Sequence, residues 1–197
     1  MGAQYNMSSI MPKKNDKRDR LIDAANELIY QKTFNATTLA DIAAKANVPL
    51  GNVYYYFKTK DDILKAVIQK RSAELQAQFR AFEEAFPNAK DRLRALIAES
   101  IKTSETTAQY GCTLGSLCQE LGKFTGELSQ IAAELMHRTL EWVDAQFNAM
   151  GKGEQSGVLA KYLIGSLQGV SLLTLTFKDP SLLQRQSKTL EKWLEAA

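Results

Sequence analysis

The four prolines of this 197-residue chain lie only at the edges of amphipathic segments. Pro12, Pro49, Pro87 and Pro180 each stand where a helical pattern of apolar residues starts or stops. A proline inside a helix removes a backbone hydrogen bond and clashes with the preceding turn, so the long stretches between these positions remain free to form helices. Apolar residues recur there every three or four positions, which is the spacing of one helix face. The sequence therefore predicts an all-α fold.

The N-terminal part carries three short helical patterns. The first helix is predicted at 17–31, where the apolar residues share one face. Thr38 can start the second helix, because its hydroxyl can accept the N–H of Asp41 while the Asp41 carboxylate returns the bond. Pro49 ends that helix and suits the first turn of a third one at about 50–57. Two short helices joined by a tight turn predict a helix-turn-helix, whose second helix enters the major groove of DNA.

The remaining patterns predict a long connecting helix and a helical bundle. The connector starts after Thr59 or Asp61, either of which can cap it, and continues towards Phe86. Glycines mark the breaks between the later patterns. Together with the first four, these give about nine helices, the last five being predicted at about 88–108, 113–123, 126–150, 155–177 and 180–195.

Positive charge gathers in the N-terminal part. Residues 1–60 carry nine Lys and Arg against five Asp and Glu, whereas residues 61–197 carry sixteen against seventeen. Such an asymmetry suits a polyanionic partner, although lysines on a solvated face are the commoner meaning. We expect a flexible basic arm at 1–15, a three-helix DNA-binding domain at 16–62, and an effector-binding and dimerisation domain at 63–197 that begins with the connector.

The third helix has the residues of a DNA-reading helix. Val53 and Phe57, four positions apart, can anchor it in the core and leave the residues between them outside. Gly51 permits close approach of the backbone to DNA, and Asn52 can reach a base edge or a phosphate. Tyrosine hydroxyls and Lys60 can add phosphate bonds. An aromatic core stripe is the alternative interpretation of 54–57, but the capping box, turn proline, glycine and lysines together favour DNA binding.

Two stretches of this domain resemble a known family. The sequence TTLADIA at 37–43, followed by VPLGNVYYYFKTK at 48–60, resembles the signature of TetR-family regulators, with a match over about 17–64. The resemblance implies a three-helix DNA-binding head, a divergent ligand-binding body, and a homodimer that releases a palindromic double-stranded DNA operator when an effector binds.

The resemblance also assigns DNA contacts by position. It implies that Thr38 and Lys60 hold phosphates. Ala40 and Leu50 stand where many relatives have a charged or polar base-reader, so base readout here would depend on thymine methyl groups and DNA shape. The other predicted contacts are Lys45 and Pro49, Tyr54 and Tyr56 beside the backbone, and Gly51, Asn52 and Tyr55 facing the groove.

A pocket for a largely apolar small molecule is expected among the helices from the connector to 155–177. His137 could bond an effector or titrate near neutral pH, although a lone helical histidine more often lies at the surface or in a satisfied core site. The candidate lining residues are Phe79, Phe82, Tyr110, Cys112, Phe124, His137, Trp142, Phe147, Tyr162 and Gln168.

Cys112 stands just ahead of a predicted helix start. The helix dipole would favour its thiolate there. The stretch around it resembles a Gly-Cys-x-x-Gly segment in a subset of TetR-family regulators, some of which sense electrophiles or oxidants; packing as a small buried residue is the alternative. The six-residue spacing to Cys118 fits neither a redox pair nor a zinc site, and the chain has one histidine, so we expect no metal and no cofactor.

The segment 155–177 is apolar almost all round and carries Gly165 and Gly169 four positions apart, which allows close helix packing. With the last helix it is predicted to form a dimer interface, in agreement with the resemblance, and packing within one chain is the alternative. The interface residues predicted are Gly165, Gly169, Leu172, Leu182, Leu190 and Trp193.

The sequence thus predicts a DNA-binding transcriptional regulator, a repressor released from its operator by a small molecule, with Cys112-based sensing as the alternative. Binding of the effector would change the angle of the connector and so the spacing of the two recognition helices. An enzyme using the same cavity, or a helical protein-interaction module, is a remote alternative, because no nucleophile elbow, phosphate-binding loop or metal spacing is present in the sequence. We predict no catalytic residue.

The sequence shows no secretory signal and no uninterrupted apolar span, so a cytoplasmic location without membrane insertion is expected.

Overall fold

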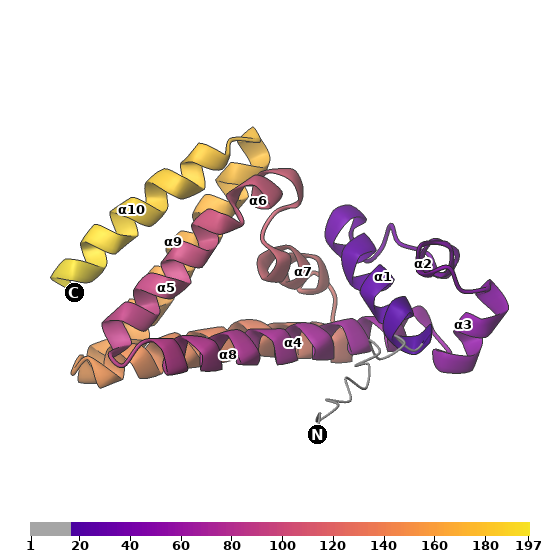
Figure 1. The fold of residues 1–197 in the computed structure, drawn as a ribbon, viewed down its shortest axis with the longest axis horizontal. Coiled ribbons are helices and arrows are strands. Elements are labelled where there is room, and N and C mark those ends of the chain that lie inside the picture. The colour runs from indigo at the N-terminus through magenta and orange to yellow at the C-terminus, as the bar shows by residue number, and fades with distance from the viewer. Residues whose placement is uncertain (1–16) are drawn as a thin grey trace, which may run out of the picture.

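The computed structural model describes residues 17–197, which form helices and no strand (Figure 1). This confirms the expected all-α fold. The arm expected at 1–15 lies outside the described residues. The helices are α1 (Lys17–Lys32), α2 (Leu39–Ala46), α3 (Leu50–Tyr56), α4 (Lys60–Ala85), α5 (Ala89–Lys102), α6 (Ser104–Tyr110), α7 (Thr113–Leu121), α8 (Glu127–Ala149), a short 3-10 turn η1 (Gly153–Gln155), α9 (Ser156–Phe177) and α10 (Pro180–Ala196).

One predicted helix is divided in two. The segment expected as a single helix at 88–108 forms α5 and α6, which meet at Thr103. The Thr103 hydroxyl lies 3.4 Å from the carbonyl oxygen of Glu99 and 3.2 Å from that of Ser100. A threonine side chain that bonds nearby carbonyls competes with the helical backbone pattern, which accounts for the break.

The head, α1 to α3, is built by local capping signals. The Thr38 hydroxyl accepts the N–H of Asp41 and the Asp41 carboxylate accepts the N–H of Thr38, both at 3.1 Å, so the predicted capping box is present. These bonds lower the pKa of Asp41. Asn47 ends α2 in the left-handed conformation, and the Arg20 guanidinium of α1 donates to its carbonyl at 2.7 Å. The turn between α2 and α3 is thereby tied to α1.

The head is continuous with the rest of the molecule. A capping box of Thr59 and Asp62 starts α4, and the first half of α4 packs in the same apolar core as α1, α2 and α3. Leu117 and Leu121 of α7 and Leu135 of α8 belong to that core as well. The core therefore crosses from the head into the body.

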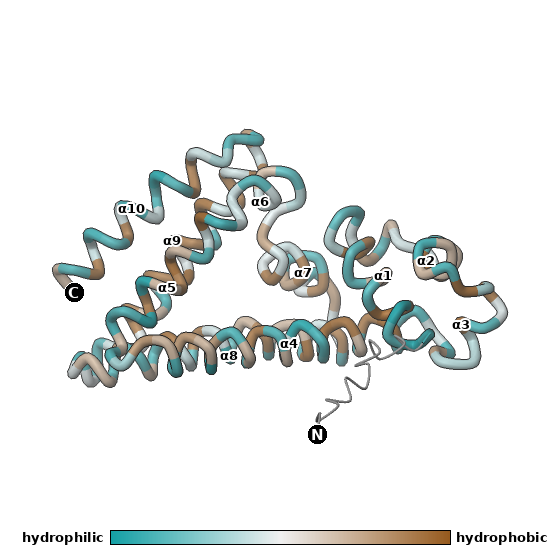
Figure 2. Tube along the Cα trace, in the orientation of Figure 1, coloured by the Kyte–Doolittle hydropathy of each residue, from teal (hydrophilic) through white to brown (hydrophobic). Residues whose placement is uncertain are grey.

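The body is a helical bundle around a second core. Helices α5, α8, α9 and α10 contribute its buried residues, while α4 runs beside α8 towards the head (Figure 1). Figure 2 shows hydrophobic stretches along α9 and at the start of α4. In this arrangement α2 and α3 lie at the opposite end of the molecule from the C-terminal end of α10 (Figure 1).

Helix α9 is long and apolar. By length and composition alone, the segment Gly153–Phe177 could cross a membrane, but core helices of soluble proteins pass the same test. Part of its surface is buried in the second core, with Leu163 and Ile164 among the residues covered. Packing in the bundle therefore explains part of its composition, while other apolar residues of α9 remain exposed.

Candidate functional site

Helix α3 exposes an apolar and aromatic face. Val53 and Phe57 anchor it in the head core, with 0% and 3% of their surface exposed, as the sequence predicted. On the opposite side Leu50 is 43% exposed, Tyr54 48% and Tyr55 79%. Exposed apolar residues gathered on one short helix indicate a contact surface for a partner.

The start of α3 is open, whereas its end is partly covered. A Cβ atom added at Gly51 would meet no atom within 4 Å, so nothing in the protein fills the space in front of this residue. Asn52 is half-buried. Tyr56, expected to turn outward, is also half-buried, packs against the head core and meets the ring of Tyr55 edge-on at 5.0 Å. Tyr56 therefore packs behind the exposed face of α3 and contributes little to its surface.

Two of the cations predicted to contact DNA are held by neighbouring groups of the head. Lys45 pairs with Glu27 at 2.6 Å, and its hydrogen bond lowers the pKa of that carboxyl. Lys60 lies 4.3 Å from the centre of the Phe34 ring and donates to the carbonyl of Asn35 at 3.3 Å. Such contacts orient the long side chains without removing their positive charge from the surface.

The other predicted contacts of the head are exposed. Thr38 uses its hydroxyl oxygen in the capping box and keeps the hydroxyl hydrogen as a donor. Ala40 in the first turn of α2 and Pro49 at the start of α3 are exposed as well. The head thus offers a mainly apolar helix face together with cations and hydroxyl groups.

The body contains a cavity of about 280 Å³. Its lining combines aliphatic side chains with hydroxyl and amide groups and includes one carboxylate but no Lys, Arg or His. The carboxylate is Glu99, which pairs with Lys102 at 2.7 Å. Polar lining residues include Gln78, Ser100, Thr107, Cys112, Thr139, Gln168 and Ser171, and aliphatic ones include Leu75, Leu96, Leu114, Ile164, Leu167 and Leu183.

Two of the predicted pocket residues line this cavity, and they touch each other. The amide nitrogen of Gln168 donates to the Cys112 sulfur at 3.5 Å, and the N–H of Gly115 donates to the same sulfur at 3.4 Å. Cys112 is the N-cap of α7. Cys118 differs, because burial raises the pKa of its thiol to about 11 and its sulfur bonds the carbonyl of Ala132 at 3.3 Å.

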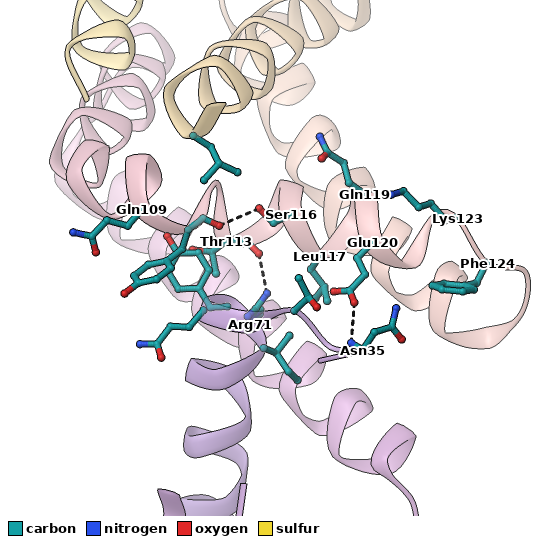
Figure 3. A pocket seen from close by; sticks show the side chains of 16 residues that line it. Asn35, Arg71, Gln109, Thr113, Ser116, Leu117, Gln119, Glu120, Lys123 and Phe124 are labelled. Carbon is teal, nitrogen blue, oxygen red and sulfur yellow. Dashed lines mark hydrogen bonds between the residues drawn. The ribbon is translucent and has the colours of Figure 1, made fainter. Parts of the chain in front are cut away.

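A second cavity, of about 520 Å³, lies between α1 of the head and α7 of the body (Figure 3). Tyr110 and Phe124, two more of the predicted pocket residues, line it. The guanidinium of Arg71 reaches its wall from α4, and Glu120 faces it from α7 (Figure 3). We call this space the junction cavity.

Six predicted pocket residues do not line either cavity. Phe79 stacks on Trp142 with ring centres 4.3 Å apart, and Phe82 packs against the same indole, so these three residues join α4 to α8. Phe147 is fully buried in the second core. His137 is exposed and lies 3.1 Å from Glu141.

Tyr162 is the sixth residue, and it lies on the exposed face of α9 against Trp193 of α10. The six were chosen only by their location on the helices predicted to surround the pocket, whereas aromatic rings gain most by packing on one another. The prediction that these residues line the pocket is wrong for the cavities described.

The predicted dimer residues divide into two groups. Gly165, Gly169 and Leu172 are exposed on α9, and Cβ atoms added at the two glycines would meet nothing within 4 Å. Leu182 and Trp193 are half-buried. Leu190 is only 1% exposed in the single chain and packs in the second core, so its assignment to the interface is wrong.

Sequence reasoning missed the residues that join head and body. Arg71 stands between Val67 and Leu75, in register with the apolar face of α4, and a charged residue on such a stripe could have drawn attention to it. Tyr30 and Glu120 have no such local signal, because their partners are more than 75 positions away in the sequence.

The head exposes a recognition helix and is joined to a body that contains a cavity. This combination defines a helix-turn-helix DNA-binding regulator. The family described as bacterial regulatory proteins, tetR family, matches residues 21–67 of the chain. That range covers most of the head and the first residues of α4. Residues 21–67 therefore resemble the DNA-binding domain of this family, and the comparisons support the prediction of a TetR-family, DNA-binding transcriptional regulator.

Known proteins resemble the chain over most of its length. The transcriptional repressor ComR of Escherichia coli is 28% identical over 91% of this chain and 85% of its own. The transcriptional repressor DhaR of a Mycobacterium species is 26% identical over 79% of this chain and 80% of its own. A TetR transcriptional regulator from Legionella pneumophila shares the fold, with a TM-score of 0.82, 22% identity and coverage of 92% and 98% of the two chains.

Phe147 lies in the second core and His137 at the surface, so replacing each by alanine should have different effects on stability. Phe147→Ala should lower the free energy of unfolding by about 3–5 kcal/mol, because it removes a fully buried ring from the second core. His137→Ala should change it by less than about 0.5 kcal/mol, because the imidazole is exposed. Urea unfolding followed by circular dichroism at one protein concentration measures both. Equal effects of the two substitutions would contradict the placement of Phe147 in the core.

Proposed function

We propose that the chain is a repressor that binds a palindromic double-stranded operator as a homodimer and releases it when a small molecule occupies the 280 Å³ cavity. The exposed face of α3 carries this proposal, since an apolar and aromatic helix surface beside cations suits the major groove and its phosphates. We place the protein in the cytoplasm, because the regulators that it resembles are soluble DNA-binding proteins. Its resemblance to transcription regulators also favours a binding cavity over an enzymatic one.

The head supplies both kinds of DNA contact in this proposal. Lys60 and the hydroxyl of Thr38 bind phosphates and fix the orientation of the head. Leu50 and Tyr55 face the bases, where an aliphatic side chain can contact a thymine methyl group. The open space in front of Gly51 allows the α3 backbone to approach a DNA strand closely.

The substitution Gly51→Ala should weaken DNA binding without weakening folding. The added methyl group meets no protein atom and alanine favours a helix, so the melting temperature should stay unchanged or rise. Operator affinity should fall by at least about tenfold, or 1.4 kcal/mol, because the methyl group stands between α3 and the DNA backbone. Fluorescence anisotropy with DNA from upstream of the gene, at several salt concentrations, measures the affinity.

The control for this experiment is Gln76→Ala, which changes an exposed residue of α4 outside the head. It should bind like the wild type. Unchanged affinity of the Gly51→Ala protein would exclude close approach of α3 to DNA. Absence of salt-dependent binding by the wild type would contradict the proposed function itself.

The dimer is proposed to form through α9. Its exposed surface carries Val158, Tyr162, Leu172, Leu173 and Phe177, each at least 47% exposed in the single chain. Exposed apolar residues along one long helix indicate a protein interface, and the uncovered glycines allow a partner helix to approach closely. A second copy of the chain would cover both the exposed apolar residues and the glycines.

Leu172→Glu should convert the dimer to a monomer at micromolar concentration, because two carboxylates would be buried near each other across the symmetric interface. The helical circular dichroism of the chain should be preserved, since Leu172 is 49% exposed in the monomer. Gln76→Glu adds the same charge at an exposed site of α4 and should remain dimeric. Sedimentation velocity distinguishes the two states, and a dimeric Leu172→Glu protein would exclude this interface.

The cavity suggests the chemistry of the effector. Thr139 and Ser171 donate their hydroxyl hydrogens to the carbonyls of Leu135 and Leu167, at 3.0 and 2.7 Å, so their oxygens are available as acceptors. With Glu99 also in the lining, the site favours a ligand that donates hydrogen bonds. A volume of 280 Å³ lies just below the usual 300–1,000 Å³ range of ligand sites. We expect a small neutral or cationic molecule with an apolar part.

A thiol-based mechanism is the second candidate. It is favoured by the position of Cys112, which lines the cavity, caps α7 and accepts two N–H donors that would also stabilise a thiolate. If oxidants are the signal, hydrogen peroxide, which converts a single thiol to a sulfenic acid, should lower operator affinity of the wild type and leave the Cys112→Ser protein unaffected, as measured by anisotropy. Cys118→Ser is the matched control and should respond like the wild type. An equal response of the Cys112→Ser protein would exclude Cys112 as the sensor.

A further inference from the structure

Arg71 of α4 is a buried cation whose hydrogen bonds all go to neutral groups. It is 8% exposed, and burial lowers its pKa, although a guanidinium remains protonated at neutral pH. Among residues 17–197 it forms no ion pair, and Glu74, one turn further along α4, pairs with Lys70 at 3.2 Å. A buried charge is costly, and an apolar residue of similar size would often serve stability as well. A role in orienting its neighbours gives a reason for its presence.

The acceptors of Arg71 lie on two different parts of the molecule. Its Nε donates to Oδ1 of Asn26 at 2.7 Å and its Nη2 to the carbonyl of Asn26 at 3.3 Å, both in α1 of the head. Its Nη1 donates at 2.8 Å to the carbonyl of Thr113, the first residue of α7 (Figure 3). One planar guanidinium therefore fixes the head, the connector and the start of α7 relative to one another.

Thr113 borders the body cavity, so an occupant of that cavity would act on it directly. It lines the 280 Å³ cavity and also the junction cavity, so it borders both spaces. Cys112 and Leu114, on either side of it, line the body cavity too. A ligand that displaces the first turn of α7 would displace the carbonyl that Arg71 holds.

The other end of α7 is attached to the head as well. The Glu120 carboxylate accepts the backbone N–H groups of Phe34 and Asn35, both at 2.9 Å, in the turn between α1 and α2 (Figure 3). Helix α7 is about 13 Å long, so its two ends connect the wall of the body cavity with the turn that leads into the helix-turn-helix. A shift of α7 as a unit would reach the head at both contacts.

We infer that Arg71 is the positioning residue that couples occupancy of the body cavity to the orientation of the DNA-binding head, through the carbonyl of Thr113 and the side chain of Asn26. This inference rests on the proposed function. A lysine at position 71 keeps the charge but cannot hold the two acceptors in one planar fork. The substitution should therefore weaken coupling more than folding.

The test uses N-ethylmaleimide as a probe of the cavity in the intact protein. The reagent adds to the Cys112 thiol and places a bulky group at the start of α7, while the raised pKa of Cys118 disfavours reaction there. Peptide mass mapping verifies the site of labelling. Operator affinity is measured by anisotropy, and hydrogen exchange is measured in the turn of α1 that follows Asn26, which reports the Arg71 contact without DNA.

In the wild type, labelling should lower operator affinity by at least about tenfold and speed exchange in this turn of α1. Arg71→Lys should respond to labelling by less than about twofold in affinity, with no change in exchange. Asn26→Ala, which removes only the head-side acceptor, should be uncoupled in the same way and serves if Arg71→Lys does not fold. Arg138→Lys alters a guanidinium that bonds Ser72 of α4 and Glu134 of α8 and should respond like the wild type.

A full response in the Arg71→Lys and Asn26→Ala proteins would overturn the inference, as would a wild type in which labelling changes neither affinity nor exchange. Absence of operator binding by the unlabelled wild type would contradict the proposed function instead. The exchange measurement would still decide whether Arg71 transmits a change in the cavity to the head.

Discussion

The orientation of the DNA-binding head depends on the apolar core that it shares with the body. Leu21, Val53 and Ile63 bring α1, α3 and α4 into this core, and Leu117 and Leu135 add α7 and α8. Because burial of apolar surface is the dominant stabilising term, a head joined in this way is not a freely hinged module. Its angle can change only if the packing of α4, α7 and α8 against it changes.

Much of the fold could be predicted from local signals. Apolar periodicity located nearly every helix, and Thr38 with Asp41 marked the start of α2 correctly, because capping depends on residues three apart. The break at Thr103 was missed, since threonine also occurs within helices and only the backbone shows where its hydroxyl bonds. The exposed face of α3 followed from the two buried anchors, Val53 and Phe57, on its other side.

The lining of the cavity could not be predicted in the same way. Location on the predicted helices suggested Phe79, Trp142 and Phe147, but these rings pack against other aromatic rings in the bundle. Which face of an amphipathic helix meets a cavity depends on how several helices cross, and no spacing within one helix encodes that. The hydroxyl groups that line the cavity, such as those of Thr139 and Ser171, are inconspicuous in a helical sequence.

The absence of Lys, Arg and His from the lining of the body cavity has a consequence for the signals that the regulator can receive. Burying a carboxylate or a phosphate without a cation is prohibitively costly, and Glu99 would add repulsion. Under the proposed function, the phosphorylated and carboxylated intermediates of metabolism are therefore disfavoured as effectors. Neutral and cationic molecules remain, and the small neutral ones cross lipid bilayers unaided, so the proposed regulator is suited to report compounds that diffuse into the cell.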